Sequence, residues 1–360
     1  MGSDYAQSST QRLATGSTRF DRRTCAAGNS GSSVSVNHLM LRRVLRQSSI
    51  EVAFPATVDA QAFETQIKAC GVRSSLRTAV SFDHTSVTFA PIDTLVAMLC
   101  LYNRLAHEGA AVEVVWQAQQ GSFSYAERMG FFALLDPRVR VTPARPKRST
   151  TFKIHQRPNK HFLEMRSLDL SKRDDADDAI GVLHGQLAGL LGAGEGRRDA
   201  AKRIWTCASE TIGNIFEHSR SPVPGIVGAQ LYSSDNRGQR IELVIADAGL
   251  GLLTTIRTGN PQAAGTKTDV ALILEAFRKG LSSKLEPGRG CGLTQCAALA
   301  AKYEGNLRVR TGSTWVKLVT KSQKGWTVGI YDDEAAMVAG TQLVFTFYLD
   351  RVSRAANLVH

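Results

Sequence analysis

The chain has 360 residues, of which 43% are hydrophobic and 21% charged, which excludes a fibrous or wholly disordered protein and predicts two or three domains. Its longest near-apolar run, residues 94–102, is shorter than the roughly 20 residues of a membrane span, its first residues are polar, and its six cysteines form no C-x-x-C pair. We therefore expect a cytoplasmic protein with no membrane contact, secretion signal or disulfide framework. The net charge is +12, and much of the excess lies in one central segment.

Residues 1–37 are rich in Ser, Thr, Gly and Arg and show little apolar periodicity, so we expect a disordered leader. In residues 38–141, strand-like and helix-like patterns alternate, which predicts a small α/β domain. The predicted strands are residues 50–54, 79–82, 87–89 and 112–116. The predicted helices are residues 59–70, residues 93–107 with Asp93 as N-cap, and residues 122–135.

A basic linker with three prolines and room for one strand is predicted for residues 142–175. Residues 138–173 hold eleven lysines and arginines against two acids, a net charge of +9. Such a segment attracts polyanions, but a charge run is more often a solvated surface, here between domains, and both interpretations stay open.

A second domain is predicted for residues 176–350, followed by a tail at 351–360. Its helical patterns come first and its strands follow, which predicts an α+β sandwich with helices layered on one mixed sheet. The predicted helices are residues 179–191, 198–218 and 294–303, and the predicted strands include residues 226–232, 241–246 and 342–349.

The helix at residues 198–218 carries the first candidate site. Glu210, Asn214 and His218 recur every four residues, so they share one helical face beside the apolar Ile212 and Ile215. A carboxamide oxygen can bind Mg²⁺ and a carboxylate can orient or deprotonate water. The alternative is an ordinary amphipathic surface helix.

Three further segments carry candidate site residues. A mostly apolar strand ends in Asp247, and Gly249 and Gly251 follow, so a carboxylate acceptor lies beside backbone that a ligand can approach closely. Residues 288–292 alternate glycine with other residues before a helix, whose free N–H groups favour phosphate. The last strand opens with Gly340 and Thr341.

Together these segments resemble the nucleotide-binding domain of the GHKL superfamily, which includes gyrase, heat-shock-90 chaperones, histidine kinases and MutL proteins. The E-x-x-x-N helix is similar to the N-box of that family, D-x-G-x-G to its first glycine box and the later G-x-G-x-G to its second, and they occur in family order. The resemblance covers residues 176–350, about half of the chain. It implies an α/β sandwich that binds ATP and Mg²⁺.

The resemblance also implies a role for each candidate residue. Glu210 would activate water, Asn214 would hold the Mg²⁺ that bridges the phosphates, and Asp247 would bind the adenine amino group. Thr341 would touch the base side or a bound water, and residues 254–286 would form a mobile lid. The other residues implied to line the nucleotide site are His218, Gly249, Gly251, Lys284, Gly288, Arg289, Gly290 and Gly292.

The small domain resembles a STAS domain, the module of anti-sigma-factor antagonists, in residues 87–89, 93–95 and 112–116. This resemblance implies a protein partner. The serine that is phosphorylated in that family is not evident here, and Thr94 is a candidate substitute.

We expect a Mg²⁺-dependent ATP-binding regulatory protein, a slow ATPase whose lid closure controls partner binding. Two alternatives stay open: a protein serine kinase of the anti-sigma-factor type, and a nucleic-acid-associated ATPase that uses the basic stretch. A histidine kinase is less favoured, because the nearest candidate acceptor, His184, is followed by no acid. A homodimer also stays open.

Overall fold

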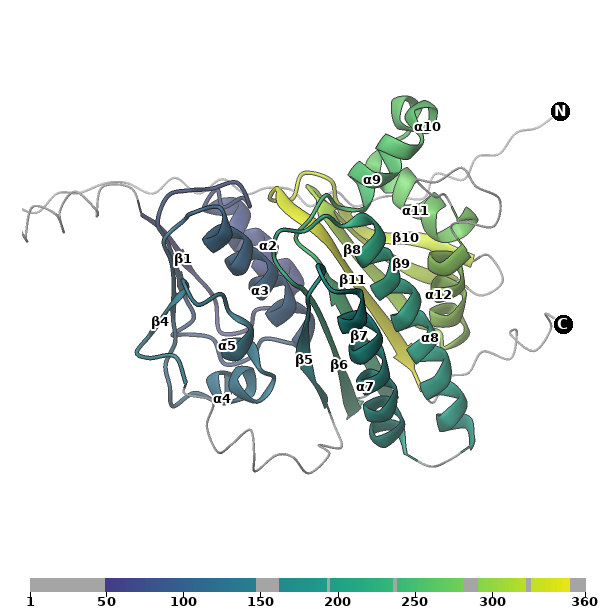
Figure 1. Ribbon diagram of the computed structural model, residues 1–360, viewed down its shortest axis with the longest axis horizontal. Coiled ribbons are helices and arrows are strands. Elements are labelled where there is room, and N and C mark those ends of the chain that lie inside the picture. The colour runs from purple at the N-terminus through teal and green to yellow at the C-terminus, as the bar shows by residue number, and fades with distance from the viewer. Residues whose placement is uncertain are drawn as a thin grey trace, which may run out of the picture. The chain divides into compact units, whose positions relative to one another are not determined.

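The computed structural model describes residues 49–146, 162–192, 195–235, 238–280, 291–321 and 325–349, all within one compact unit. The fold is mixed α/β, with a four-stranded parallel sheet followed by helices layered on a seven-stranded sheet (Figure 1). This confirms the predicted fold class. The leader at residues 1–37 and the tail at 351–360 lie outside the described residues.

The smaller sheet pairs its four strands in chain order, and every pairing is parallel. Helices connect consecutive strands, as parallel pairing requires. The elements are β1 (Ile50–Ala53), α2 (Ala60–Ala69), β2 (Val80–Asp83), α3 (Ile92–His107), β3 (Val112–Val115), α4 (Gly121–Arg128), α5 (Phe131–Leu134) and β4 (Arg140–Thr142).

Three predicted elements of this part differ from the structure. Residues 87–89 form no strand beyond a single bridge from Phe89 to Thr57. The long helix begins at Ile92 with Pro91 as its N-cap, so Asp93 lies in the first turn. The predicted helix at residues 122–135 is broken at Gly130, whose φ of 82° is left-handed.

The larger sheet has the strand order β10-β9-β8-β11-β7-β6-β5. All its pairings are antiparallel, where the sequence predicted a mixed sheet. Three of the pairings join strands that follow one another directly in the chain, β6 with β7, β8 with β9 and β9 with β10. The strands are β5 (Phe162–Leu168), β6 (Gly225–Asp235), β7 (Gly238–Ala246), β8 (Asn306–Gly312), β9 (Thr314–Lys321), β10 (Gly325–Asp332) and β11 (Val338–Tyr348). The helices are α7 (Arg173–Leu191), α8 (Glu195–His218), α9 (Leu252–Gly259), α10 (Pro261–Thr266), α11 (Asp269–Lys279) and α12 (Cys291–Lys302).

Both faces of the larger sheet are covered. Leu243 and Ile245 of β7 point into a core shared with α7, α8 and α12, whereas Val244 and Ala246 point into a core shared with α3 (Figure 1). Thirteen of the sixteen residues of α3 are buried, as a helix packed on all sides requires. The start of α3 lies so close to β6 that a Cβ at Gly228 of β6 would lie 2.9 Å from Cδ1 of Ile92.

An ion pair and hydrogen bonds also connect the small α/β part to the larger sheet. Asp93 is 2% exposed and pairs with Arg308 of β8 at 2.6 Å, and its carbonyl accepts a hydrogen bond from Gln342. Tyr125 of α4 donates to Gln230 of β6. Thr94 is fully buried, so it is not accessible as the phosphorylation site that the STAS resemblance suggested.

A buried arginine joins α2 to the larger sheet. Arg310 of β8 donates to both carboxylate oxygens of Glu64, at 2.5 and 3.2 Å. It also donates to the carbonyls of Gly312, Ala336 and Val338. All five N–H groups of this guanidinium therefore have an acceptor that the protein supplies.

We expect Arg310→Met to lower the free energy of unfolding by about 3–5 kcal/mol, because it leaves the Glu64 carboxylate buried without its partner. The matched control is Lys68→Met, since Lys68 also joins α2 to the larger sheet through Asp332, but at 3.8 Å between half-exposed side chains. That variant should lose less than about 1 kcal/mol. Urea unfolding measures both losses of stability. Equal losses would contradict the larger contribution that we expect from the buried Arg310–Glu64 pair.

The core of the smaller part contains a buried histidine. His84 stacks on Trp116 with ring centroids 4.3 Å apart, and its Nε2 lies 3.1 Å from the hydroxyl of Tyr102. Burial lowers the pKa of His84 to about 3, although the nearby Asp83 charge opposes this shift. The ring is therefore neutral in the folded protein under most conditions.

The unfolded chain binds a proton at His84 near pH 6.5, whereas the folded chain does so only near pH 3, so the free energy of unfolding falls as the pH falls through this window. We expect His84 to contribute about 2 kcal/mol of this loss between pH 7 and pH 5, at 1.36 kcal/mol per pH unit. His84→Phe keeps an aromatic ring at this position but cannot bind a proton, so it removes this contribution to the pH dependence. Urea unfolding of both proteins at the two pH values tests this, and an identical pH dependence would contradict it.

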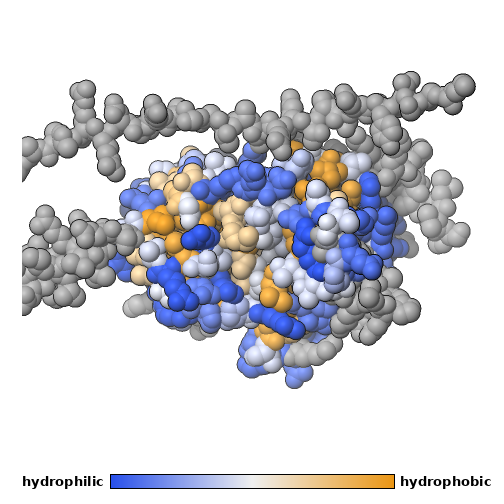
Figure 2. Space-filling view, turned by 90° about the horizontal axis from the view of Figure 1, so that it is seen from above, coloured by the Kyte–Doolittle hydropathy of each residue, from blue (hydrophilic) through white to orange (hydrophobic). Residues whose placement is uncertain are grey.

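Exposed apolar side chains are scattered over the described residues. The large ones are Phe89, Val182, Leu250, Ile330 and Met337. On the face that Figure 2 shows, apolar atoms form separate groups between polar ones. Among the described residues, no helix is both long and apolar enough to cross a membrane.

Candidate functional site

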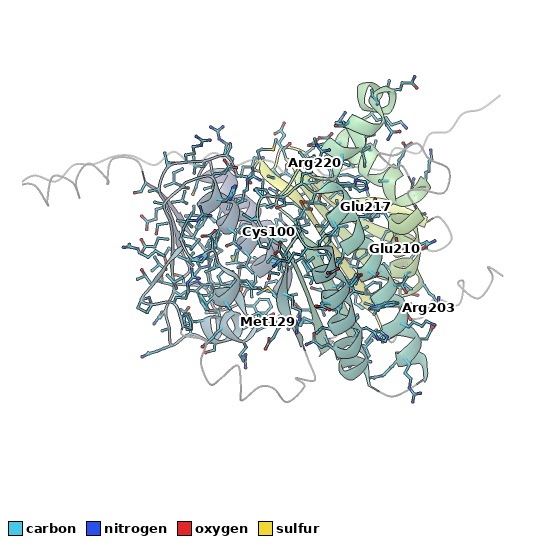
Figure 3. All side chains as sticks on the ribbon, in the orientation of Figure 1. Cys100, Met129, Arg203, Glu210, Glu217 and Arg220 are labelled. Atoms are coloured by element: carbon cyan, nitrogen blue, oxygen red, sulfur yellow. The ribbon has the colours of Figure 1, made fainter. Side chains whose placement is uncertain are left out.

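The first part of the site is one face of α8. Glu210 is exposed, and Asn214 and His218 are half-buried, while Ile212 and Ile215 are buried against the core. Figure 3 shows Glu210 and Glu217 along this helix. Within the described residues, no cluster of three or more His, Cys, Asp or Glu side chains could hold a metal ion. A cation at Asn214 would therefore take most of its ligands from a bound molecule and water.

The second part is the turn that follows β7. Asp247 is buried, and its Oδ1 accepts hydrogen bonds from the hydroxyl of Ser219, at 2.7 Å, and from the N–H of Gly249, at 2.8 Å. Burial raises the pKa of Asp247, and the hydrogen bonds from Ser219, Gly249 and the Thr341 N–H oppose this shift. Ser219 directly follows α8, so this bond ties the turn to the end of that helix.

Three glycines in this region have no room for a side chain. A Cβ at Gly249 would overlap the carbonyl of Ser219, and a Cβ at Gly340 would overlap the carbonyl of Asp247. Gly251 has a φ of 84° and closely approaches Thr311. The turn is therefore held between α8 and β11 by backbone packing.

Thr341 joins the turn to α9. Its backbone carbonyl accepts a hydrogen bond from the N–H of Asp247 at 2.9 Å. Its hydroxyl oxygen accepts the N–H of Leu252, at the start of α9, at 2.7 Å. The sequence-predicted Asp247, Gly249, Gly251 and Thr341 therefore lie together.

The start of α12 is the third part. A Cβ at Gly292 would lie 2.6 Å from Oε2 of Glu210, so this end of α12 lies directly against the site face of α8. Lys284, Gly288, Arg289 and Gly290 lie outside the described residues.

The segment predicted as a lid is partly a packed helix layer. Within residues 254–286, α11 buries Leu272, Ile273, Ala276 and Phe277 in the core that includes α8 and α12. Arg257 of α9 pairs with Asp269 of α11 at 2.5 Å. The described part of this segment, up to residue 280, is thus anchored by apolar packing and an ion pair.

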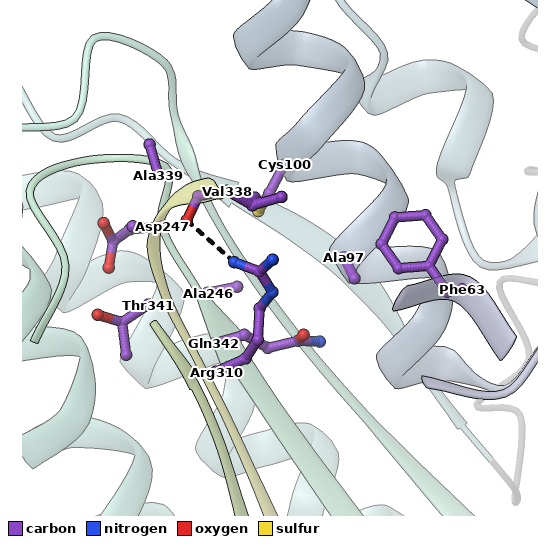
Figure 4. A pocket seen from close by; sticks show the side chains of 11 residues that line it. Phe63, Ala97, Cys100, Ala246, Asp247, Arg310, Val338, Ala339, Thr341 and Gln342 are labelled. Carbon is purple, nitrogen blue, oxygen red and sulfur yellow. Dashed lines mark hydrogen bonds between the residues drawn. The ribbon is translucent and has the colours of Figure 1, made fainter. Parts of the chain in front are cut away.

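A small cavity of about 20 Å³ lies between the turn after β7 and the helices α2 and α3. It has room for one water molecule. Its lining includes Phe63 and Ala97 from the smaller part and Asp247 and Thr341 from the larger. In Figure 4, the side chains of Asp247 and Thr341 lie across Arg310 from Phe63 and Ala97. This cavity is far too small for a nucleotide.

The sequence did not single out Ser219. A serine just after a helix is usually an isolated polar residue, and only the fold brings its hydroxyl to Asp247, 28 residues away. The pair of Gly340 with Asp247 was also missed, since its signal is a close backbone approach across two strands.

In comparisons with known proteins, no family model matches the chain and no curated protein matches it significantly.

We expect Gly340→Ala to destabilise the protein by more than about 3 kcal/mol, because the new Cβ overlaps backbone and the φ of 91° is left-handed. Gly213→Ala in α8 is the control. Apart from the adjacent backbone of its own helix, nothing lies within 4 Å of its Cβ position, so this change should raise stability by up to about 1 kcal/mol. Thermal unfolding compares the two, and a tolerated Gly340→Ala would show that the turn is not tightly held.

Proposed function

We propose that residues 176–350 bind ATP with Mg²⁺ and act as a nucleotide-dependent regulatory module. The observation that carries this proposal is the arrangement along α8. Glu210, in the interior of α8, lies against Gly292 at the start of α12, and Ser219, the residue that follows α8, binds Asp247. Groups suited to phosphate and to adenine thus lie at the two ends of the stretch from Glu210 to Ser219.

The spacing supports a ligand that lies along the helix. Glu210 and His218 are eight residues apart, which corresponds to about 12 Å at 1.5 Å per residue. Asn214 lies midway and is half-buried, so its carboxamide oxygen is suited to a cation between the two ends. A nucleoside triphosphate has its base, sugar and phosphates in this same linear order.

Each end has suitable chemistry. The carboxylate of Asp247 can accept a hydrogen bond from an exocyclic amine. The first turn of α12 has the positive end of a helix dipole, which favours phosphate. The exposed Glu210 lies beside this end, where it can orient a water for slow hydrolysis.

The test is calorimetric titration of the full chain with ATP, with and without Mg²⁺, on the wild type and Asp247→Asn. Asn keeps an oxygen for Ser219 and Gly249 but presents N–H donors to the adenine amine, so we expect binding to weaken about tenfold or more. Because the buried charge disappears, the free energy of unfolding should change by less than about 1 kcal/mol. Gly213→Ala is the binding control and should leave the affinity unchanged.

Equal ATP affinity in the wild type and in Asp247→Asn would contradict the adenine role of Asp247. Absence of ATP binding by the wild type, with and without Mg²⁺, would overturn the proposed function itself. A large loss of stability in Asp247→Asn would show that Asp247 is a structural residue.

A further inference from the structure

The small α/β part reaches the candidate nucleotide turn directly. Arg104, near the end of α3, donates a hydrogen bond from Nη1 to the carbonyl of Ala248 at 3.0 Å. Ala248 lies between Asp247 and Gly249, 144 positions away in the sequence. Its side chain is buried in the core that α3 shares with the larger sheet.

The guanidinium of Arg104 is held in place from its own helix. Nη2 pairs with Oε1 of Glu108 at 2.6 Å, and both side chains are only 21% exposed. Glu108 is the C-cap residue of α3, and α3 is a largely buried helix. The donor that reaches Ala248 is therefore carried by a rigid element.

The peptide group between Ala248 and Gly249 is hydrogen-bonded at both its carbonyl oxygen and its N–H. The Ala248 carbonyl and the Gly249 N–H belong to the same planar peptide, and that N–H donates to Oδ1 of Asp247 at 2.8 Å. Fixing the carbonyl oxygen therefore fixes the direction of the N–H. A charged donor on the oxygen also polarises the peptide and strengthens its hydrogen bond to the carboxylate.

We propose that Arg104 is a positioning residue, through which the small α/β part sets the Asp247 turn and with it the affinity for nucleotide. The nucleotide part of this inference rests on the function proposed above. Because Arg104 belongs to a different part of the fold from the candidate site, any change that shifts α3 alters the turn. By reciprocity, nucleotide binding would alter the small part to the same extent in free energy.

The test uses the full chain with Arg104→Met, which keeps the apolar stem and removes the donor, and Arg104→Lys, which restores one cationic donor. The first readout is hydrogen exchange of the Gly249 amide without nucleotide. We expect exchange to become about tenfold faster in Arg104→Met and to recover in part in Arg104→Lys. The second readout is ATP affinity by calorimetry, which should fall about tenfold and recover in the same order.

Tyr125→Phe is the matched control. Tyr125 also joins the small part to the larger sheet, through Gln230, but it does not touch the turn. A general loosening of the packing would affect Gly249 exchange in this variant too, whereas the proposal predicts no change.

Unchanged Gly249 exchange in Arg104→Met would overturn the positioning role, as would an equal effect in Tyr125→Phe. Faster exchange with unchanged ATP affinity would overturn the link to nucleotide. If the wild type binds no ATP, the proposed function fails, and Gly249 exchange still decides whether Arg104 positions the turn.

Discussion

The arrangement of the candidate site depends on one steric constraint, the absence of space for side chains around the turn after β7. The backbone of this turn touches the residue that follows α8 on one side and the start of β11 on the other, at Gly249 and Gly340. Such close approach fixes the distance between a helix and two strands without any long side chain. The hydrogen bonds of Asp247 then add direction to a geometry that packing has already set.

The sequence allowed the local features of the site to be predicted, because each lies within a short window. The helical face of Glu210, Asn214 and His218 follows from their spacing, and the turn follows from an apolar strand before Asp247. Contacts between distant segments were not predictable in this way, because nothing near Ser219 or Arg104 points to the turn. Element boundaries failed where tertiary contacts decided them, as at Asp93, whose carboxylate pairs with Arg308 rather than capping its helix.

The surface between α3 and the larger sheet is unusual for a core, since it buries several charges. Burial and the neighbouring Asp93 raise the pKa of Glu242, and the charges of Asp93 and Glu242 raise the pKa of Arg308 despite its own burial. Buried ion pairs add little net stability, because desolvation offsets most of their attraction. We expect them to favour one orientation of α3, since a shifted helix would separate Asp93 from Arg308.

The close contact between Ile92 and Gly228 couples the sizes of two residues that are far apart in the chain. A Cβ at position 228 would lie 2.9 Å from Cδ1 of Ile92, so the isoleucine would have to turn away from it. A smaller residue at position 92 is therefore expected to make a larger residue at position 228 easier to accept. Replacing only one side of this contact would lose that match.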